Sequence, residues 1–204
     1  PRGKTLGGSS PINGLIYIRG QREDYDHWAA LGNAGWGHDD VLPYFVRSEG
    51  NQRGAIAGHG GDGPLKVSDI GAKHELIEAF IAGAQQVGVP RTDDFNGVHQ
   101  EGAGYFQLTT YNGWRCSTAS AYLKPAKHRP NLRIETDAFA AGLVMEGTRA
   151  VGVRYRQGGV IKTARCRGEV LLSAGSIQSP QLLQLSGIGP RALLEARGVP
   201  VVVD

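Results

Sequence analysis

The sequence is poor in the residues that mark several large classes of protein. It has only two cysteines, Cys116 and Cys166, and their spacing fits neither a metal site nor a disulfide framework. No apolar run approaches the roughly 20 residues that a membrane-spanning helix needs, and no signal peptide is visible. We therefore expect a protein without a transmembrane segment in a reduced compartment, the cytoplasm, either free or attached to a membrane surface.

Strong charge of one sign is also missing. The 22 basic and 19 acidic residues give a formal net charge of +3, and the two kinds are interspersed along the chain. Such a pattern does not indicate a nucleic-acid surface. With 204 residues, 40% of them hydrophobic, the chain can bury the core of one domain or of two small ones.

Glycine, by contrast, is abundant, and the glycine-rich stretch with the most chemical content spans residues 3–20. Gly7 and Gly8 free the backbone for positive φ, and Ser9 and Ser10 can cap a helix. The apolar residues from 12 to 16 then predict a buried helix. A tight turn that opens a helix suits a phosphate, a carboxylate or an electron-rich ring.

This stretch has two other interpretations. Gly3-Lys4-Thr5 has the form of the end of a nucleotide-binding P-loop. A P-loop continues directly into a helix, whereas Gly7, Gly8 and Pro11 interrupt the residues where that helix would begin. The other alternative is that the glycine turn is merely a structural connection.

The rest of the chain predicts a mixture of helices and strands. The run 169–175 is continuously apolar, which is typical of a parallel strand buried on both faces, and a helix follows from Ser179. The glycine-rich stretch 50–63 predicts a surface loop with a solvated His59. Alternation and turn residues predict a β-meander over 132–165. Further helices are expected at 21–31, 38–46, 74–87 and 190–197, and strands at 63–68, 105–111 and 199–203.

Two signatures resemble those of a known family. The run Gly-Lys-Thr-Leu-Gly-Gly-Ser-Ser-Pro-Ile-Asn at 3–13 and the run Gly-Ser-Ile-Gln-Ser-Pro-Gln-Leu-Leu at 175–183 resemble the first and second signatures of the glucose–methanol–choline (GMC) family of FAD-dependent oxidoreductases. Residues 113–123 resemble a further run of that family. Residues 19–28 are most similar to its choline-dehydrogenase-like members.

The resemblance implies an α/β fold with a partial, Rossmann-like FAD-binding domain, a partial substrate-binding domain and a β-meander. The FAD-binding domain would comprise 1–36 and 112–204, and the substrate-domain insertion or lid would comprise 37–111. The Rossmann glycine turn of the family would precede Pro1, and its catalytic histidine with a histidine or asparagine partner would follow Asp204. We therefore expect an internal piece of a longer protein and name no catalytic residue in it.

The resemblance also implies the cofactor contacts. The residues expected to contact FAD are Gly7, Gly8, Ser9, Asn13, Gly14, Leu15, Ile16, Ala140, Ala174 and Gly175. Ala140 stands where the family commonly has a valine. Some relatives attach FAD through a histidine in the first signature, but this chain has Ile12 there, so non-covalent binding is expected.

The implied reaction is oxidation of an alcohol, choline or another primary alcohol, to an aldehyde or ketone. A hydride would pass to the flavin N5, and oxygen or a quinone would accept the electrons. Two alternatives remain open: a lyase on the same fold, and a non-catalytic fragment that binds a nucleotide. For the isolated chain we expect weak or absent FAD retention and no turnover.

Overall fold

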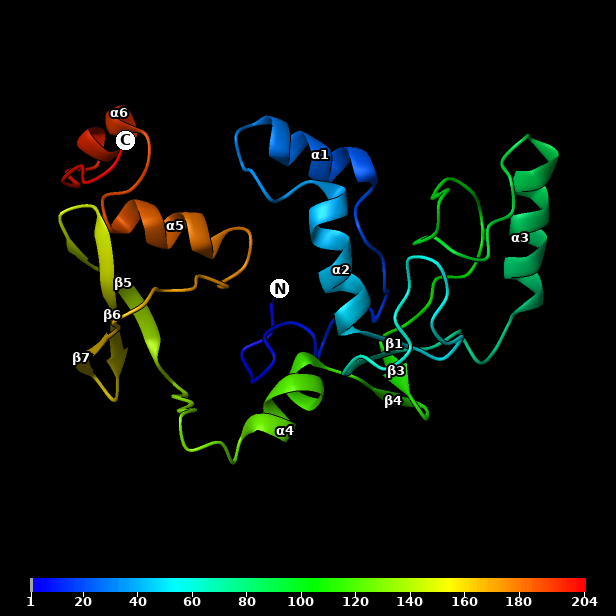
Figure 1. The fold of residues 1–204 in the computed structure, drawn as a ribbon, viewed down its shortest axis with the longest axis horizontal. Helices are drawn as coiled ribbons and strands as arrows, with labels where there is room; N and C mark the ends of the chain where they lie inside the picture. Colours follow the sequence, from blue (N-terminus) through cyan, green and yellow to red (C-terminus); the bar gives the residue numbers. More distant parts are fainter. Residues whose placement is uncertain (1) are drawn as a thin grey trace. The chain divides into compact units, whose positions relative to one another are not determined.

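The structure is a computed structural model that describes residues 2–204 (Figure 1). The chain forms two compact units, Pro1–Leu132 and Arg133–Asp204. The boundaries predicted at residues 36 and 111 both fall inside the first unit.

The first unit combines helices with short strands. Its helices are α1 (Arg22–Ala30), α2 (His38–Ser48), α3 (Glu75–Gln86), the π-helical turn η1 (Ala119–Leu123) and α4 (Lys124–Ala126). One two-stranded sheet pairs β1 (Glu49–Asn51) in parallel with β2 (Leu65–Val67), and another pairs β3 (Thr110–Tyr111) antiparallel to β4 (Trp114–Arg115).

The helices α1 and α2 confirm the predicted helices at 21–31 and 38–46. Each begins with a carboxylate that accepts a hydrogen bond from the backbone just ahead of the helix: Asp24 from the Gln21 N–H at 2.8 Å, and Asp40 from the Gly37 N–H at 3.1 Å. Tyr25 is buried between the two helices, with its ring centroid 5.6 Å from that of Phe45. The two helices therefore share a small aromatic core.

Helix α3 confirms the predicted helix at 74–87. The side chain of His74 caps it by accepting the N–H of Leu76 at 3.2 Å. Ile81 is buried on its inner face, while Leu76 and Phe80 are exposed.

The second unit is built on the predicted β-meander, which the structure confirms. The strands β5 (Phe139–Glu146), β6 (Arg149–Gln157) and β7 (Val160–Arg165) form one antiparallel sheet in chain order. Helix α5 (Gln178–Leu185) packs on β5 and is tied to it by the hydroxyl of Ser186, which accepts the Leu143 N–H at 2.8 Å. Helix α6 (Arg191–Ala196) follows, with Leu194 buried.

The predicted buried helix after residue 12 is wrong. Successive turns cover residues 5–13, and the chain then runs extended. Tyr17 donates its N–H to the carbonyl of Gln107 at 2.8 Å, and Thr109 donates its N–H to the carbonyl of Leu15 at 2.8 Å. The backbone groups that a helix would pair internally are thus paired with the segment 107–109 instead.

Several predicted strands are also wrong or shorter than expected. Residues 169–175 form no strand, and Leu171 is 79% exposed. A buried parallel strand needs neighbouring strands to pair with, and no sheet within residues 2–204 includes this run. Of 105–111 only Thr110–Tyr111 is a strand, residues 132–136 form none, and 199–203 is reduced to one bridge between Ile188 and Val203.

Two further findings concern the described part of the chain. No helix within residues 2–204 is both long and apolar enough to cross a bilayer. Nor do these residues contain a cluster of three or more histidine, cysteine, aspartate or glutamate side chains placed to hold a metal ion.

Candidate functional site

The opening turn depends on glycine at its centre. Gly7 and Gly8 have φ of 91° and 63°, a region that residues with a side chain rarely adopt. A Cβ on Gly7 would lie 3.0 Å from the backbone nitrogen of Ala119, whereas a Cβ on Gly8 would meet nothing within 4 Å. Gly7 therefore permits both the turn and its close approach to the start of η1.

The two serines of the turn point back into it rather than capping a helix. The N–H of Gly3 donates to Ser9 Oγ at 3.0 Å, and Ser10 Oγ donates to the carbonyl of Gly7 at 2.6 Å. Ser10 Oγ also accepts the N–H of Thr118 at 3.0 Å. These bonds fix the turn from inside and join it to the segment before η1.

Arg115 holds the far end of the turn, and sequence reasoning did not select it as a site residue. Its Nη1 donates to the carbonyl of Ser10 at 3.1 Å, and to the carbonyl and side-chain Oδ1 of Asn13 at 2.8 Å and 2.7 Å. The signal was available, because Arg115 belongs to the run at 113–123 that resembles the family. Its role is to fix the backbone path between residues 10 and 13.

Leu15 carries the strain of the site. Its φ is 68°, left-handed for a branched residue, which costs roughly 1–2 kcal/mol. Hydrogen bonds on both sides impose this conformation: Asn13 Oδ1 accepts the Leu15 N–H at 3.1 Å, and the Leu15 carbonyl accepts from both the N–H and the hydroxyl of Thr109. Strain of this kind concentrates at ligand-contacting and other functional positions.

The turn leaves backbone donors available. The N–H groups of Ser9, Gly14 and Ile16 have no hydrogen-bond acceptor among residues 2–204, and all three residues are exposed. The exposed side chains of Ile12 and Ile16 supply apolar surface beside them. Free donors next to apolar side chains suit a ring system whose edge carries hydrogen-bond acceptors.

Seven of the predicted contact residues, 7–9 and 13–16, lie in the turn and in the extended residues that directly follow it. The other three lie in the second unit. Ala140 is on β5, opposite Tyr155 of β6. Ala174 and Gly175 directly precede α5, where the Ala174 N–H donates to Ser179 Oγ at 3.0 Å and Gly175 has φ of 95°. The role of all ten residues in binding a cofactor stays a prediction.

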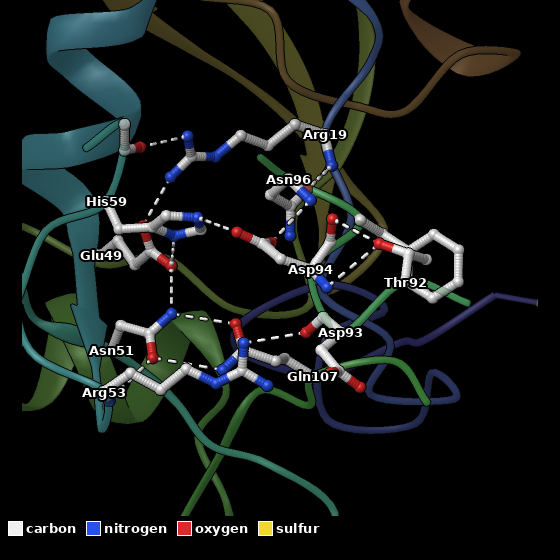
Figure 2. A network of polar contacts seen from close by, with 12 residues as sticks. Arg19, Glu49, Asn51, Arg53, His59, Thr92, Asp93, Asp94, Asn96 and Gln107 are labelled. Carbon is white, nitrogen blue, oxygen red and sulfur yellow. Dashed lines mark hydrogen bonds and ion pairs between the residues drawn. The ribbon is translucent and has the colours of Figure 1, made fainter. Parts of the chain in front are cut away.

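A buried polar network lies next to the turn in the first unit, and sequence reasoning missed it (Figure 2). His59 was expected in solvent, but it is 4% exposed, so that prediction is wrong. Its ring lies between the carboxylates of Glu49 and Asp94. Glu49, fully buried, also pairs with Arg19.

The glycines of the loop explain why His59 is buried. A Cβ on Gly60 would lie 1.9 Å from the carbonyl oxygen of Val46, and one on Gly63 would lie 2.4 Å from that of Glu49. These glycines therefore let the loop backbone pack directly on the end of α2. The glycine-rich sequence predicts an exposed surface loop, whereas in the structure the glycines allow close packing.

Burial, hydrogen bonds and charge shift the pKa values of two groups around the network. Burial raises the pKa of Tyr17, and the neighbouring Arg19 only partly opposes this. Burial also acts to raise the pKa of Asp69, but hydrogen bonds from Arg53 and Gln107 outweigh it and hold that pKa below its usual value. Asp69 is therefore an ionised partner of Arg53 at neutral pH.

Comparison with known proteins gives consistent results. The sequence model of the family described as GMC oxidoreductase matches residues 1–201. The oxygen-dependent choline dehydrogenase of Brucella ovis is 49% identical over 204 residues, which are 100% of this chain and 37% of the relative. The chain thus spans little more than a third of the length of this curated relative.

Solved structures resemble the chain over its full length. The pyridoxine 4-oxidase from Mesorbium loti has a TM-score of 0.90 and 32% identity, covering 100% of this chain and 40% of that one. An FAD-dependent oxidoreductase from Chaetomium thermophilum has a TM-score of 0.90 and 30% identity, with 100% and 38% coverage.

Proposed function

The chain belongs to the GMC oxidoreductase family, and from that premise we propose that it is the part of an FAD-dependent alcohol oxidoreductase that carries the flavin-binding turn. The observation that supports this most directly is the turn itself, with free N–H groups on Ser9, Gly14 and Ile16 beside the strained Leu15. The α/β fold expected from the sequence agrees with the fold of the family's solved structures.

The residues present suit FAD. The N–H groups of Ser9, Gly14 and Ile16 would donate to acceptor atoms on the flavin ring, and Gly7 and Gly8 would allow the ring to approach the backbone. FAD supplies a ring that accepts a hydride at N5. Fixed backbone donors stabilise the electron density that such a ring gains, without needing to reorient.

We propose that FAD is bound non-covalently. Covalent attachment requires a nucleophilic side chain; residues 5–16 contain no histidine, cysteine or tyrosine, and the hydroxyls of Ser9 and Ser10 are hydrogen-bonded within the turn. Ile12, at the position where a histidine would stand in relatives with attached flavin, is an exposed aliphatic residue.

We propose choline as the first substrate to test, because curated relatives at 49% identity are choline dehydrogenases. The electron acceptor would be oxygen, as in the oxygen-dependent choline dehydrogenase of Brucella ovis, or a quinone. The division into an FAD-binding part (1–36 and 112–204) and a substrate-side part (37–111) is also proposed, as is a reduced compartment such as the cytoplasm, which the free Cys116 and Cys166 support.

The test is anaerobic reduction of the flavin in the protein purified at its full natural length. Addition of choline should bleach the flavin absorbance, and pyridoxine and a simple primary alcohol serve as comparison substrates. A purified protein with flavin absorbance that no alcohol bleaches would favour a lyase on the same fold. A protein that retains no flavin would favour the non-catalytic nucleotide-binding alternative.

A further inference from the structure

We propose that His59 is held as a doubly protonated imidazolium between Glu49 and Asp94, and that this bridge positions the Tyr17–Arg19 segment directly after the cofactor turn. The first part concerns the charge state of a buried side chain and stands alone. The second part, which concerns the cofactor, rests on the proposed function.

The geometry around the ring carries the first part. His59 Nδ1 lies 3.0 Å and 3.1 Å from the two carboxylate oxygens of Glu49, and Nε2 lies 2.9 Å from Asp94 Oδ2. The side chains of His59 and Glu49 are 2% and 0% exposed. An ionised carboxylate can only accept hydrogen bonds, so two ionised partners require a proton on each ring nitrogen.

The surroundings favour ionised carboxylates on both sides. Glu49 also accepts from Arg19 Nη2, from Asn51 Nδ2 at 2.9 Å and from the Gly60 N–H at 3.2 Å, so all of its contacts are donors. Asp94 Oδ1 accepts the Asn96 N–H at 2.9 Å. A carboxylate surrounded by N–H donors is stabilised in its charged form.

The charges balance when His59 is an imidazolium. Two cations, Arg19 and His59, then face two anions, Glu49 and Asp94 (Figure 2). Charged groups nearby have partners of their own: Arg53 pairs with Asp69 at 2.7 Å, and Asp93 pairs with Arg91 at 3.6 Å. A neutral ring would leave Arg19 facing both carboxylates, of which Glu49 is fully buried and Asp94 is 27% exposed, or would require a proton on one carboxyl group.

The same cluster is hydrogen-bonded to the backbone of residues 17–19, the segment that follows the cofactor turn. Asn96, fixed by Asp94, accepts the Arg19 N–H at 2.7 Å and donates to the Tyr17 carbonyl at 3.1 Å. Gln100 Nε2 donates to the Arg19 carbonyl at 2.8 Å. These bonds hold the backbone of 17–19.

Glu49 holds the same segment through its side chain. The Arg19 guanidinium pairs with Glu49 and donates to the carbonyl of Gly58 at 2.7 Å, while its Nε is buried without a partner among the described residues. Ile16, whose N–H is free for a ligand, is the residue immediately before Tyr17. His59 thus acts as a positioning residue through both carboxylates: Glu49 through Arg19, and Asp94 through Asn96.

The charge state is tested by nitrogen-15 NMR of the full-length protein labelled in histidine. The His59 signals are assigned as those lost in His59→Gln, and His128→Gln, an exposed position, is the matched control. We expect both ring nitrogens of His59 to show the protonated signature of imidazolium at neutral pH. In Asp94→Asn we expect His59 to change to a neutral tautomer, because the second anion is gone. A neutral ring in the unchanged protein overturns the assignment.

The positioning role is tested by FAD affinity, measured by fluorescence on reconstitution of the full-length apoprotein. If the ordered form of 17–19 falls to about a tenth of the population in His59→Gln, the apparent dissociation constant rises about tenfold. His128→Gln should leave it unchanged. An unchanged dissociation constant in a folded His59→Gln overturns the positioning role.

Asp94→Asn keeps the proposal testable if His59→Gln does not fold. It preserves size, and it should raise the FAD dissociation constant by a smaller factor than His59→Gln. An Asp94→Asn protein with a neutral His59 ring and unchanged FAD affinity would also overturn the positioning role. If the unchanged protein binds no FAD, the proposed function fails, while the NMR result still decides the charge of His59.

Discussion

The first unit contains two regions that treat their polar groups in opposite ways. In the opening turn, backbone donors at Ser9, Gly14 and Ile16 are left free and Leu15 is strained. In the network around Glu49, nearly every polar atom has a partner. Unpaired donors are tolerated where a ligand can satisfy them, and a buried charge is tolerated only where the protein satisfies it.

The two regions are also neighbours along one segment. Residues 13–16 end the turn, and residues 17–19 are bonded to the network through Asn96 and Glu49. The exposed region therefore lies beside a support that is buried and rigidly bonded. A binding site gains precision when its contacts are held by such a second layer of interactions.

The largest effect should come from breaking the network at its centre. Glu49→Gln removes the anion that Arg19 and His59 share, and loss of one partner from a buried pair costs about 3–5 kcal/mol. Denaturant unfolding of the full-length protein measures it. Glu146→Gln, which alters an exposed pair with Arg165, is the control and should change stability little. Equal effects of the two variants would show that the network is not the stabilising region.

Next in size should be a change inside the turn. Gly7→Ala places a side chain at φ of 91° and 3.0 Å from Ala119, whereas Gly8→Ala meets open space at φ of 63°. We expect Gly7→Ala to cost about 1–3 kcal/mol and to weaken FAD binding more than Gly8→Ala does. Thermal release of FAD and unfolding, measured side by side, distinguish the two. A Gly8→Ala variant that is the worse of the pair would contradict the role given to the η1 contact.

A smaller effect is expected at Arg115, which holds the far end of the turn. Arg115→Met removes the donor shared by the carbonyls of Ser10 and Asn13; bonds to a charged group are worth up to about 1.5–3 kcal/mol, and less here because solvent reaches the Arg115–Asn13 bond. We expect weaker FAD binding with only modest loss of stability, since the turn is exposed. Arg133→Met, at a largely exposed arginine, is the control. Unchanged FAD affinity in Arg115→Met would mean that the turn keeps its conformation without the hydrogen bonds from Arg115.

The comparison of the two regions also shows what sequence can and cannot predict. Local chemistry placed the helices that begin near Gly37 and His74, and turn residues placed the β-meander, because neighbours in sequence determine those elements. The turn was found from its glycines. Its conformation was not, because the extended path after Leu15 is imposed by bonds to residues 107–109.

The network could not be read from the sequence for the same reason. The network joins residues that are far apart in the sequence: Arg19 and Glu49 are 30 positions apart, Glu49 and His59 are 10 apart, and His59 and Asp94 are 35 apart. No local sequence pattern connects them. His59 lies among glycines, a composition typical of exposed loops. Only the close packing of Gly60 and Gly63 against residues 46–49 buries it. The predicted strand at 169–175 failed likewise, because pairing partners decide whether an apolar run becomes a strand.

The smallest effect should be seen at a charge pair that neither region uses. Arg22 donates to both carboxylate oxygens of Asp39, and these bonds hold the Asp39 pKa at about 2, below its usual 3.8. A lowered pKa in the folded state stabilises the protein above the unfolded-state value, and this contribution is lost as the pH falls from about 3.8 through about 2. Asp39→Asn should therefore lower the stability of the folded state only at pH values above that window and at low salt, because the pair is exposed and ions screen it. The free energy of unfolding, measured across pH 2–7 at two salt concentrations, checks this. If Asp39→Asn lowered it as much as Glu49→Gln does, buried and exposed charges would not differ in the way that the comparison requires.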